Sequence, residues 1–459
     1  MKNRKSPHLL KFILTLFILS SIAILSCSKD DKPTIDPDPV DPLAAVKKYT
    51  FEIMTDIYYW YDQVPRNIYA PNVKTIFDYF DTLLVKQDRW SWMMTGEQYL
   101  SSETGVVKSY GISLGQAVDY YDDYSVRVRY VHPNSPMDTK GVKRGFKLTH
   151  LNGVSVNSLI SDGTFNSVFA RENNAFTFLD HDNKEVSFDL SAQVINTRSY
   201  LKKMVITPND YPGLSHNIGY FNYLSFKAQM LDDISDAIQM FKDANIKELI
   251  LDLRYNGGGD SRATSLLANL IAKESAHGKI LAKRSHNNKY KSLDANGQTI
   301  IERDPSKSLN LERIYILTTR GSASASEVIL NGLKPLMNIV QVGSTTYGKP
   351  NGMYVMPYPE GNYDNPSFVF LPTSFFTVNS EGYGDYANGL VPDHYRPDDL
   401  FHDFGLSDDW LKACLHYSIN GAFPPLPSKP SSAFYSNIIR KRVAVPEDSP
   451  NYGVYKVVL

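Results

Sequence analysis

The sequence predicts a multidomain α+β protein, and three observations support this fold class. The chain has 459 residues, which exceeds the usual size of one domain and predicts two or three folded units. Its composition, 42% apolar with 30 Tyr and 22 Phe, is typical of a globular protein with a substantial core. The hydrophobic pattern also changes along the chain, from helical spacing to short strands and then to alternating strands and helices.

Residues 1–26 have the layout of a secretory signal peptide. Basic residues precede an apolar run that extends from Phe12 to Leu25. A bilayer span needs about 20 residues, so this run favours a cleaved signal over the alternative of a permanent transmembrane helix. The following Ser26-Cys27 resembles a bacterial lipobox and predicts lipidation of Cys27, with an ordinary buried thiol as the other interpretation.

Residues 27–42 are predicted to form a disordered tether, because their Asp-Pro repeats leave almost nothing apolar to bury. The Ser-Lys-Asp-Asp that follows the cysteine is similar to signals that send some bacterial lipoproteins to the cell surface, although a solvated linker explains it equally well. The predicted location is the cell envelope, as an outer-membrane-anchored lipoprotein that is periplasmic or surface-exposed.

Residues 43–105 are predicted to form a helical N-terminal domain, since apolar side chains such as Val46 and Ile57 recur every three or four positions. Trp90 and Trp92 belong to an aromatic cluster near its end. We interpret that cluster as core rather than as a substrate surface.

Residues 106–194 predict a small β-rich domain. Ser-Pro-Met-Asp at 135–138, Gly-Val-Lys-Arg-Gly-Phe at 141–146 and Leu-Asn-Gly at 151–153 resemble the PDZ domain of bacterial proteases. PDZ domains add an extended peptide to a sheet edge and capture its terminal carboxylate on loop N–H groups. The resemblance assigns peptide binding to Tyr110, Gly111, Ile112, Ser113 and Leu114. The alternative is a β domain that only packs against its neighbour.

Residues 195–420 alternate between strand and helix and form the candidate catalytic domain. The pattern predicts strands at 218–224, 248–253, 313–318 and 339–342, helices at 230–244 and 325–336, and a polar hairpin at 281–301. Residues 421–459 form a C-terminal tail that is rich in proline at first and strand-like around 452–459.

Charge and cysteine content exclude several classes of protein. With 48 basic and 49 acidic residues, the chain offers no electrostatic reason to bind nucleic acid. Beyond Cys27 the only cysteine is Cys414, so neither an internal disulfide nor a four-thiolate metal site is predicted. Cys414 lies in an apolar helical pattern and is predicted to be core. We expect no metal and no cofactor.

Two glycine- and serine-rich segments have the residue types of a hydrolase site. Residues 251–260, Leu-Asp-Leu-Arg-Tyr-Asn-Gly-Gly-Gly-Asp, run from an apolar strand into glycines that let backbone N–H groups approach a ligand, although a tight turn alone would explain them. Residues 319–327, Thr-Arg-Gly-Ser-Ala-Ser-Ala-Ser-Glu, place serines where a helix begins. Such a helix start can stabilise an oxyanion, while simple N-capping by serine is the alternative.

A third segment, Gly-Ser-Thr-Thr-Tyr-Gly-Lys-Pro at 343–350, nearly spells a Walker A loop. That loop needs Ser or Thr after its lysine, and Pro350 stands there, so we expect no nucleotide. As a catalytic base, Lys349 must be neutral, so burial must lower its pKa from near 10.4. The nearby Tyr347, Met353 and Val355 offer an apolar environment, and a neutral amine beside a serine hydroxyl needs no histidine.

These three segments, in this order behind a PDZ-like module, resemble the carboxyl-terminal processing (tail-specific) peptidases over residues 43–417. The resemblance implies an α/β serine peptidase core of the ClpP/crotonase-like type, with Ser324 as nucleophile and Lys349 as base. It also implies an oxyanion hole from the backbone N–H groups of Gly258 and Ala325. Many members carry a glutamine four residues after the lysine, where this chain has Met353.

The expected function is therefore an exported serine endopeptidase that acts on protein or peptide substrates and is held at the membrane by its lipid anchor. Asn351 is a candidate substitute for the missing glutamine, or the Ser–Lys pair acts alone. Two alternatives stay open: a catalytically weak or inactive peptide-binding lipoprotein, and a hydrolase in which Ser324 is paired with His394.

Overall fold

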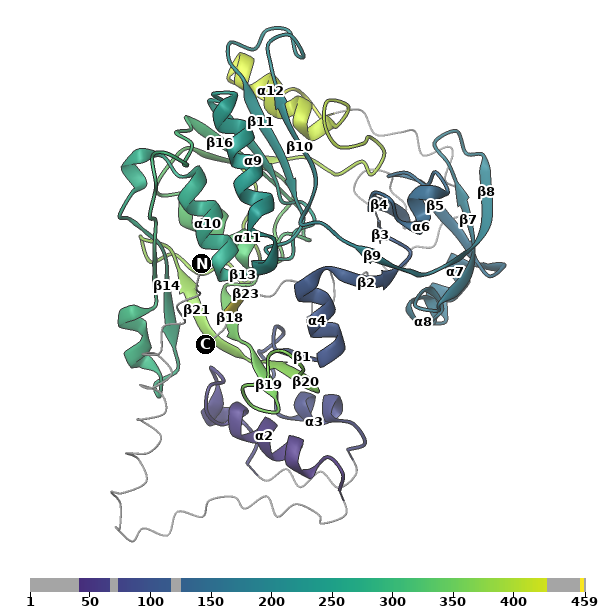
Figure 1. Cartoon of the computed structure of the whole chain (residues 1–459), viewed down its shortest axis with the longest axis vertical. Helices are drawn as coiled ribbons and strands as arrows, with labels where there is room; N and C mark the ends of the chain where they lie inside the picture. The colour runs from purple at the N-terminus through teal and green to yellow at the C-terminus, as the bar shows by residue number, and fades with distance from the viewer. Residues whose placement is uncertain (1–40, 67–72, 117–124, 427–454, 458–459) are drawn as a thin grey trace, which may run out of the picture.

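The computed structural model describes residues 41–66, 73–116, 125–426 and 455–457 (Figure 1). The predicted signal peptide, the lipidation site Cys27 and nearly all of the tether lie outside these residues. The described part has a helical N-terminal region, a β-rich unit to one side, and a core built on two six-stranded sheets (Figure 1). Within it, every helix is too short or too polar to cross a bilayer.

The N-terminal region, predicted to be helical, contains three α-helices, one 3-10 helix and one strand among its described residues. Its elements are α2 (Ala44–Met54), the 3-10 helix η1 (Tyr61–Gln63), α3 (Ile76–Thr82), β1 (Trp92–Thr95) and α4 (Gly96–Thr104). A capping box between Thr95 and Gln98 starts α4. Helical spacing did not predict β1, which pairs with β20 (Phe368–Leu371), because that partner lies far along the chain. Trp90 is buried, as expected, and Trp92 is half-buried.

The β-rich unit is joined to the rest by two paired strands, β2 (Val106–Ser109) and β9 (Gln193–Asn196), which lie between it and the core in Figure 1. Its antiparallel sheet has the order β3-β4-β5-β7-β8, and β6 pairs with β5. The elements are β3 (Ile112–Gly115), β4 (Arg127–Val131), α6 (Pro136–Thr139), β5 (Lys147–Leu151), β6 (Val154–Ser155), α7 (Val156–Ser161), α8 (Phe165–Phe169), β7 (Asn173–Leu179) and β8 (Glu185–Ser191). Val128, Phe176 and Phe178 are buried in a hydrophobic cluster that belongs to this unit alone.

The first core sheet has the order β10-β11-β12-β16-β17-β22, in which β11 through β22 run parallel and β10 is antiparallel. Its strands are β10 (Tyr200–Ile206), β11 (Ile218–Tyr223), β12 (Glu248–Asp252), β16 (Arg313–Thr318), β17 (Ile339–Gly343) and β22 (His394–Tyr395). The predicted strands at 218–224, 248–253, 313–318 and 339–342 are confirmed to within about one residue. Fully buried apolar runs are typical of parallel strands covered on both faces.

Helices cover both faces of this sheet. Leu249 and Leu251 of β12 pack with α9 (Leu231–Asp243), α10 (Ser261–Ile271) and α11 (Ala325–Leu333), whereas Ile250 packs with α12 (Asp409–Asn420) on the opposite face. This alternation follows from the two-residue period of a strand. Cys414 of α12 is buried, as predicted.

The second core sheet has the order β13-β23-β18-β21-β14-β15. Its strands are β13 (Gly259–Asp260), β14 (Ile280–His286), β15 (Gln298–Ile300), β18 (Asn351–Tyr354), β21 (Thr373–Val378) and β23 (Tyr455–Val457), with the 3-10 helices η2 (Ala228–Met230), η3 (Glu274–Ala276) and η4 (Lys291–Asn296) nearby in the chain. The predicted hairpin is the antiparallel pair β14–β15. A smaller sheet joins β1, β20 and β19 (Met356–Tyr358).

Candidate active site

The three segments that the sequence singles out meet at one edge of the first core sheet. β12, β16 and β17 are parallel neighbours, and residues 251–260, 319–327 and 343–350 follow or overlap their carboxyl ends. Loops that leave the carboxyl ends of parallel strands lie at the same edge of a sheet, where ligands commonly bind. The topology therefore brings together side chains that are distant in the sequence.

The hydroxyl groups of the three candidate serines have different environments. Ser322 Oγ donates to the Leu253 carbonyl at 2.7 Å, and Ser326 Oγ donates to the Asn256 carbonyl at 2.8 Å. Ser324 Oγ is fully buried and has no hydrogen-bond partner among the described residues. Ser322 and Ser326 thus hydrogen-bond the segment around the start of α11 to the glycine segment, whereas the Ser324 hydroxyl has no hydrogen bond among the described residues.

Ser324 stands in a strained turn between β16 and α11. Its backbone angles, φ 57° and ψ −113°, lie outside the regions that a non-glycine residue normally adopts, which costs about 1–3 kcal/mol. A serine nucleophile on a sharp strand-to-helix turn has this kind of geometry. The next residue, Ala325, begins α11, and amides in the first turn of a helix have no acceptor within it and carry positive partial charge.

Gly258 packs directly against this turn. A Cβ atom at position 258 would lie 2.9 Å from Ser324 Cβ, from the Ala323 carbonyl oxygen and from the Ala325 amide nitrogen. Its φ of 102° also belongs to the region that favours glycine. Only glycine fits here without displacing the serine turn.

The Gly258 amide, predicted to contribute to an oxyanion hole, has a side-chain acceptor in this structure. The Gly258 N–H donates to Asn256 Oδ1 at 2.8 Å, so it is already engaged. Asn side chains readily accept from the amide two residues on, and Asn256 is held in place by its own bond to the Tyr223 carbonyl. The family resemblance did not reveal this contact, because it depends on the side-chain orientation of Asn256.

Glu327 connects the serine turn to the lysine loop. Its Oε2 accepts from the backbone N–H groups of Ser324 and Lys349, each at 2.8 Å, so these nitrogens cannot lie farther apart than twice that distance. Its Oε1 accepts from Thr346 Oγ1 at 2.5 Å and from the Gly348 N–H at 2.7 Å. Burial raises the pKa of the Glu327 carboxyl, and these four hydrogen bonds oppose that rise. The Ser-x-x-Glu spacing of a capping box was a sequence signal for this residue.

Lys349 has the environment that a catalytic base requires. Its side chain is 1% exposed, and burial lowers the pKa of its amine to about 7, against the opposing charges of Asp88 and Glu327. The predicted apolar environment is present, since Tyr347, Met353 and Val355 belong to one buried hydrophobic cluster at the site. About half of the amines are therefore neutral near pH 7.

The hydrogen bond expected between the serine and the lysine is not formed. Ser324 Oγ is unpartnered among the described residues, and Lys349 Nζ lies 3.6 Å from Met353 Sδ instead. Position 353 thus does contact the amine, as the missing glutamine would, but through a weak acceptor. Asn351 is buried on the same strand, and neither its Oδ1 nor its Nδ2 has a partner among the described residues.

His394, the alternative base, lies in β22 and stacks on Phe423 with ring centroids 4.0 Å apart. It makes no hydrogen bond to Ser324 Oγ among the described residues, since that oxygen has no partner there. Burial lowers the pKa of His394.

The N-terminal region supports the lysine loop, a role that the sequence did not reveal. Trp90 Nε1 donates to the Gly348 carbonyl at 3.0 Å, and an Arg89 guanidinium nitrogen donates to the same oxygen at 2.9 Å. The guanidinium of Arg89 also lies over the Tyr347 ring. The aromatic cluster that we interpreted as core is thus both buried and directly attached to the segment that carries Lys349.

The predicted peptide-binding residues lie apart from this site. Ile112, Ser113 and Leu114 belong to β3, which is the end strand of the sheet in the β-rich unit. The Tyr110 side chain is buried in the core of that unit, and its hydroxyl donates to the Arg171 carbonyl. The neighbouring Gly111 amide donates to Ser109 Oγ at 3.0 Å.

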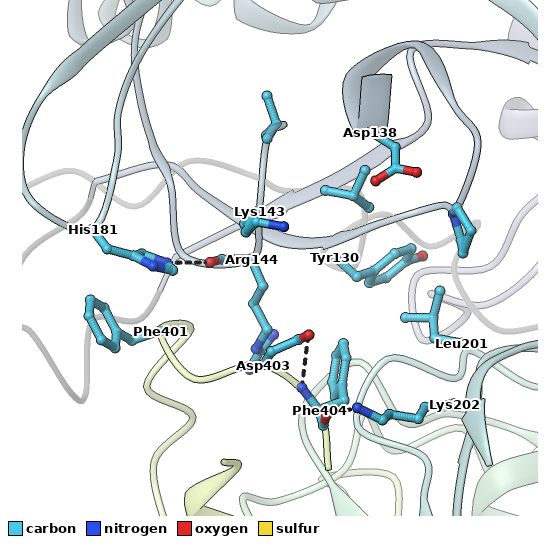
Figure 2. A pocket seen from close by; sticks show the side chains of 13 residues that line it. Tyr130, Asp138, Lys143, Arg144, His181, Leu201, Lys202, Phe401, Asp403 and Phe404 are labelled. Atoms are coloured by element: carbon cyan, nitrogen blue, oxygen red, sulfur yellow. Dashed lines mark hydrogen bonds between the residues drawn. The ribbon is translucent and has the colours of Figure 1, made fainter. Parts of the chain in front are cut away.

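A cavity of about 350 Å³ lies between the β-rich unit and the core (Figure 2). Tyr130, Lys143 and Arg144 line it from the β-rich unit, and Lys202 and Phe404 line it from the core (Figure 2). None of the predicted site residues lines this cavity. Within the described ranges, no group of three or more His, Cys, Asp or Glu side chains is arranged to hold a metal ion.

Two family models match the chain. The model for peptidase family S41 matches residues 217–394, which include Gly258, Ser324 and Lys349. The model for the peptidase S41 N-terminal domain matches residues 45–92, which include the segment that supports the lysine loop.

Individual relatives are similar over part of their length. A CtpA-like serine protease of Staphylococcus aureus is 23% identical over 310 residues, which are 67% of this chain and 57% of that protein. The carboxy-terminal processing protease CtpB of Bacillus subtilis is 24% identical over 151 residues, 32% of this chain and 28% of that protein. The chain thus spans little more than half of the Staphylococcus aureus protein and less than a third of CtpB. A crystal structure from Bacteroides fragilis, described as an S41 protease, has a TM-score of 0.62 at 21% identity, covers 80% of this chain and 96% of its own, and shares the fold.

Proposed function

We propose that the chain, which models of peptidase family S41 and of its N-terminal domain match, is a serine peptidase that hydrolyses peptide bonds with Ser324 as nucleophile and Lys349 as general base. The observation that carries this proposal is the single carboxylate of Glu327, which binds the main chain of both residues. The low pKa of the Lys349 amine and the unbonded Ser324 hydroxyl support the same assignment.

In the proposed reaction, neutral Lys349 turns from Met353 and takes the proton of Ser324 Oγ as that oxygen attacks the substrate carbonyl carbon. The oxyanion accepts from the Ala325 N–H at the start of α11, and from the Gly258 N–H once its bond to Asn256 opens. The protonated lysine then gives its proton to the leaving amine. A water molecule, deprotonated by the same lysine, then attacks the acyl carbon. The bond from that carbon to Ser324 Oγ breaks, and the lysine returns its proton to the serine oxygen.

We further propose that the β-rich unit is a PDZ-like module that binds substrate C-termini. β3 is the end strand of its sheet, so an extended peptide can be added beside it. One edge of β3 already pairs with β4 through Ile112 to Leu114, so a bound peptide would pair along the opposite edge of β3. Loss of labelled-peptide binding after deletion of residues 106–194, with the catalytic unit still folded, tests this role.

We also propose that the peptidase is exported and anchored by lipid in the cell envelope, a proposal that the predicted signal peptide and the lipobox-like Ser26-Cys27 support. Incorporation of labelled fatty acid into the expressed chain, and its loss in Cys27→Ala, tests the anchor. Whether the anchored chain is periplasmic or surface-exposed is tested by its accessibility to added protease on intact cells.

Cleavage of an unfolded reporter protein by the purified full-length chain in detergent tests the peptidase, with Ser324→Ala and Lys349→Ala in parallel. We expect activity that both substitutions abolish. The unformed Ser–Lys hydrogen bond favours one alternative, a peptide-binding protein without catalysis, and no activity in any variant would support it. Activity that survives Lys349→Ala but not His394→Ala would assign the base to the histidine.

A further inference from the structure

β23 (Tyr455–Val457) lies between the two strands that lead away from the candidate catalytic residues (Figure 1). It pairs in parallel with β13, where Gly259 faces Tyr455, and in parallel with β18, where Tyr354 faces Val457. We propose that β23 occupies the substrate slot of the active site as an internal inhibitor that a peptide substrate must displace. This inference rests on the proposed peptidase function.

The two walls of the slot come directly from the catalytic loops. β13 begins at the residue after Gly258, and β18 begins two residues after Lys349. Without β23, no described strand joins β13 to β18, because the sheet order places β23 between them. The slot is therefore one strand wide.

The outer edges of both walls are already paired. The Asp260 N–H donates to the Phe226 carbonyl at 2.7 Å, and the Phe226 N–H donates to the Gly258 carbonyl at 3.0 Å. β18 pairs along its other edge with β21. An incoming extended peptide can add only to the inner edges, which β23 now pairs with.

The slot also lies next to the nucleophile. Gly258 packs against Ser324 Cβ, and the following Gly259 is the residue that pairs with Tyr455. Neighbouring strands are about 4.8 Å apart, so the backbone at Tyr455 lies close to where a bound substrate would pass. Pairing through main-chain hydrogen bonds accepts many sequences, as in other cases of strand addition.

Two features of the site fit a resting state. With β23 in the slot, Ser324 Oγ and Lys349 Nζ are not hydrogen-bonded to each other, and the Gly258 amide is engaged by Asn256. The proposed catalysis requires the hydrogen bond between Ser324 Oγ and Lys349 Nζ to form and the hydrogen bond from the Gly258 amide to Asn256 to break. The groups that must rearrange thus flank the strand that must leave.

Tethering makes such an inhibitor effective even when the isolated segment binds weakly. A covalently attached segment commonly reaches an effective concentration in the millimolar range. If the free segment binds with a Kd of about 0.1 mM, about ten molecules have a filled slot for each one that is open. Removing the segment should then raise kcat/KM about tenfold.

The test compares three variants of the full chain on a short fluorogenic peptide. A chain that ends at Pro450, and Lys456→Pro, which removes a main-chain donor and blocks strand pairing, should each be about tenfold more active than wild type. Lys456→Ala is the matched control, because it keeps the backbone N–H, and its activity should stay at the wild-type level. Equal activity in all four proteins would overturn the inference.

A binding assay separates this inference from the proposed function. The labelled peptide Tyr-Gly-Val-Tyr-Lys-Val-Val-Leu, which copies residues 452–459, is titrated against Ser324→Ala chains with and without residues 451–459. We expect the shortened chain to bind the peptide about tenfold more tightly than the full chain, as the occupancy of about ten to one requires. Binding without any peptidase activity in the parent proteins would support the slot and refute the peptidase, whereas activity without peptide binding would refute the slot alone.

Discussion

Replacing Lys349 with methionine should abolish activity and stabilise the fold. A pKa that falls from 10.5 to about 7 corresponds to a penalty of about 5 kcal/mol for burying the charged amine. Methionine has a similar unbranched shape and no charge, so it relieves this penalty inside the apolar cluster. Incomplete relaxation of the side chains around the new methionine reduces this gain. We expect the free energy of unfolding to rise by at least about 2 kcal/mol at pH 6, which corresponds to roughly 4–8 °C in the melting temperature of a unit this size.

The pH dependence of this gain gives the sharper test. Because folding lowers the pKa of Lys349, the unfolded chain binds more protons between about pH 7 and pH 10.5, and wild-type stability rises with pH across that window. The advantage of Lys349→Met is therefore full below pH 7 and fades toward pH 10.5. Calorimetric melting of both proteins from pH 6 to pH 10, following the transition that contains the catalytic unit, measures it. A variant that is no more stable at pH 6, or whose advantage does not change with pH, would refute a buried amine with a lowered pKa.

Three further substitutions test the geometry of the site. Glu327→Gln places an amide NH2 opposite at least one backbone N–H. We therefore expect the free energy of unfolding, measured with urea, to fall by about 1–3 kcal/mol and kcat to fall at least tenfold. Unchanged kinetics would contradict the linking role of this carboxylate. Gly258→Ala should lower kcat at least about 100-fold, whereas Gly278→Ala, at a positive φ with open space around it, controls for backbone strain alone. Met353→Gln gives the Lys349 amine a stronger acceptor, which favours its charged form and raises its pKa. The rising limb of the pH–rate profile should therefore move from about pH 7 to higher pH. Met353→Leu is the control and should not move that limb to higher pH.

The features that the sequence predicts well are those carried by short local patterns. The strand, turn and helix around Ser324 follow from an apolar run, small residues and a helix start, and the structure places each within a few residues of its prediction. The burial of Lys349 follows from the apolar residues beside it. The β14–β15 hairpin was also local, since its two strands follow one another in the chain with only the 3-10 helix η4 between them.

Contacts between distant segments account for what the sequence did not predict. The strand at the end of the chain was expected, but its place between β13 and β18 was not, because a strand's pattern does not name its partners. The bond from Trp90 to the Gly348 carbonyl joins residues far apart in the chain. The hydrogen bond from the Gly258 amide to Asn256 depends on the rotamer of the Asn256 side chain, and a sequence pattern does not predict side-chain rotamers.

A buried network of charges links the β-rich unit to the glycine segment of the active site. Arg144 of the β-rich unit donates to Tyr255 Oη at 2.7 Å and to Asp398 at 2.5 Å, and Tyr255 also donates to Asp398. Although burial alone would raise the pKa of Asp398, Arg144 and Arg254 hold it below its ordinary value, so the carboxylate stays charged.

Arg254 anchors the inner end of this network. It is fully buried and binds Asp408 through two nitrogens at 2.9 and 3.0 Å, and Asp252 through its Nε. Breaking one partner of such a buried pair costs about 3–5 kcal/mol. Tyr255 is only three residues before Gly258. A displacement of the β-rich unit that pulls Arg144 away would remove one of the two cations beside Asp398 and leave Arg254, which lies 3.6 Å from that carboxylate. The β-rich unit and the glycine segment of the candidate site therefore share one buried network of hydrogen bonds and ion pairs.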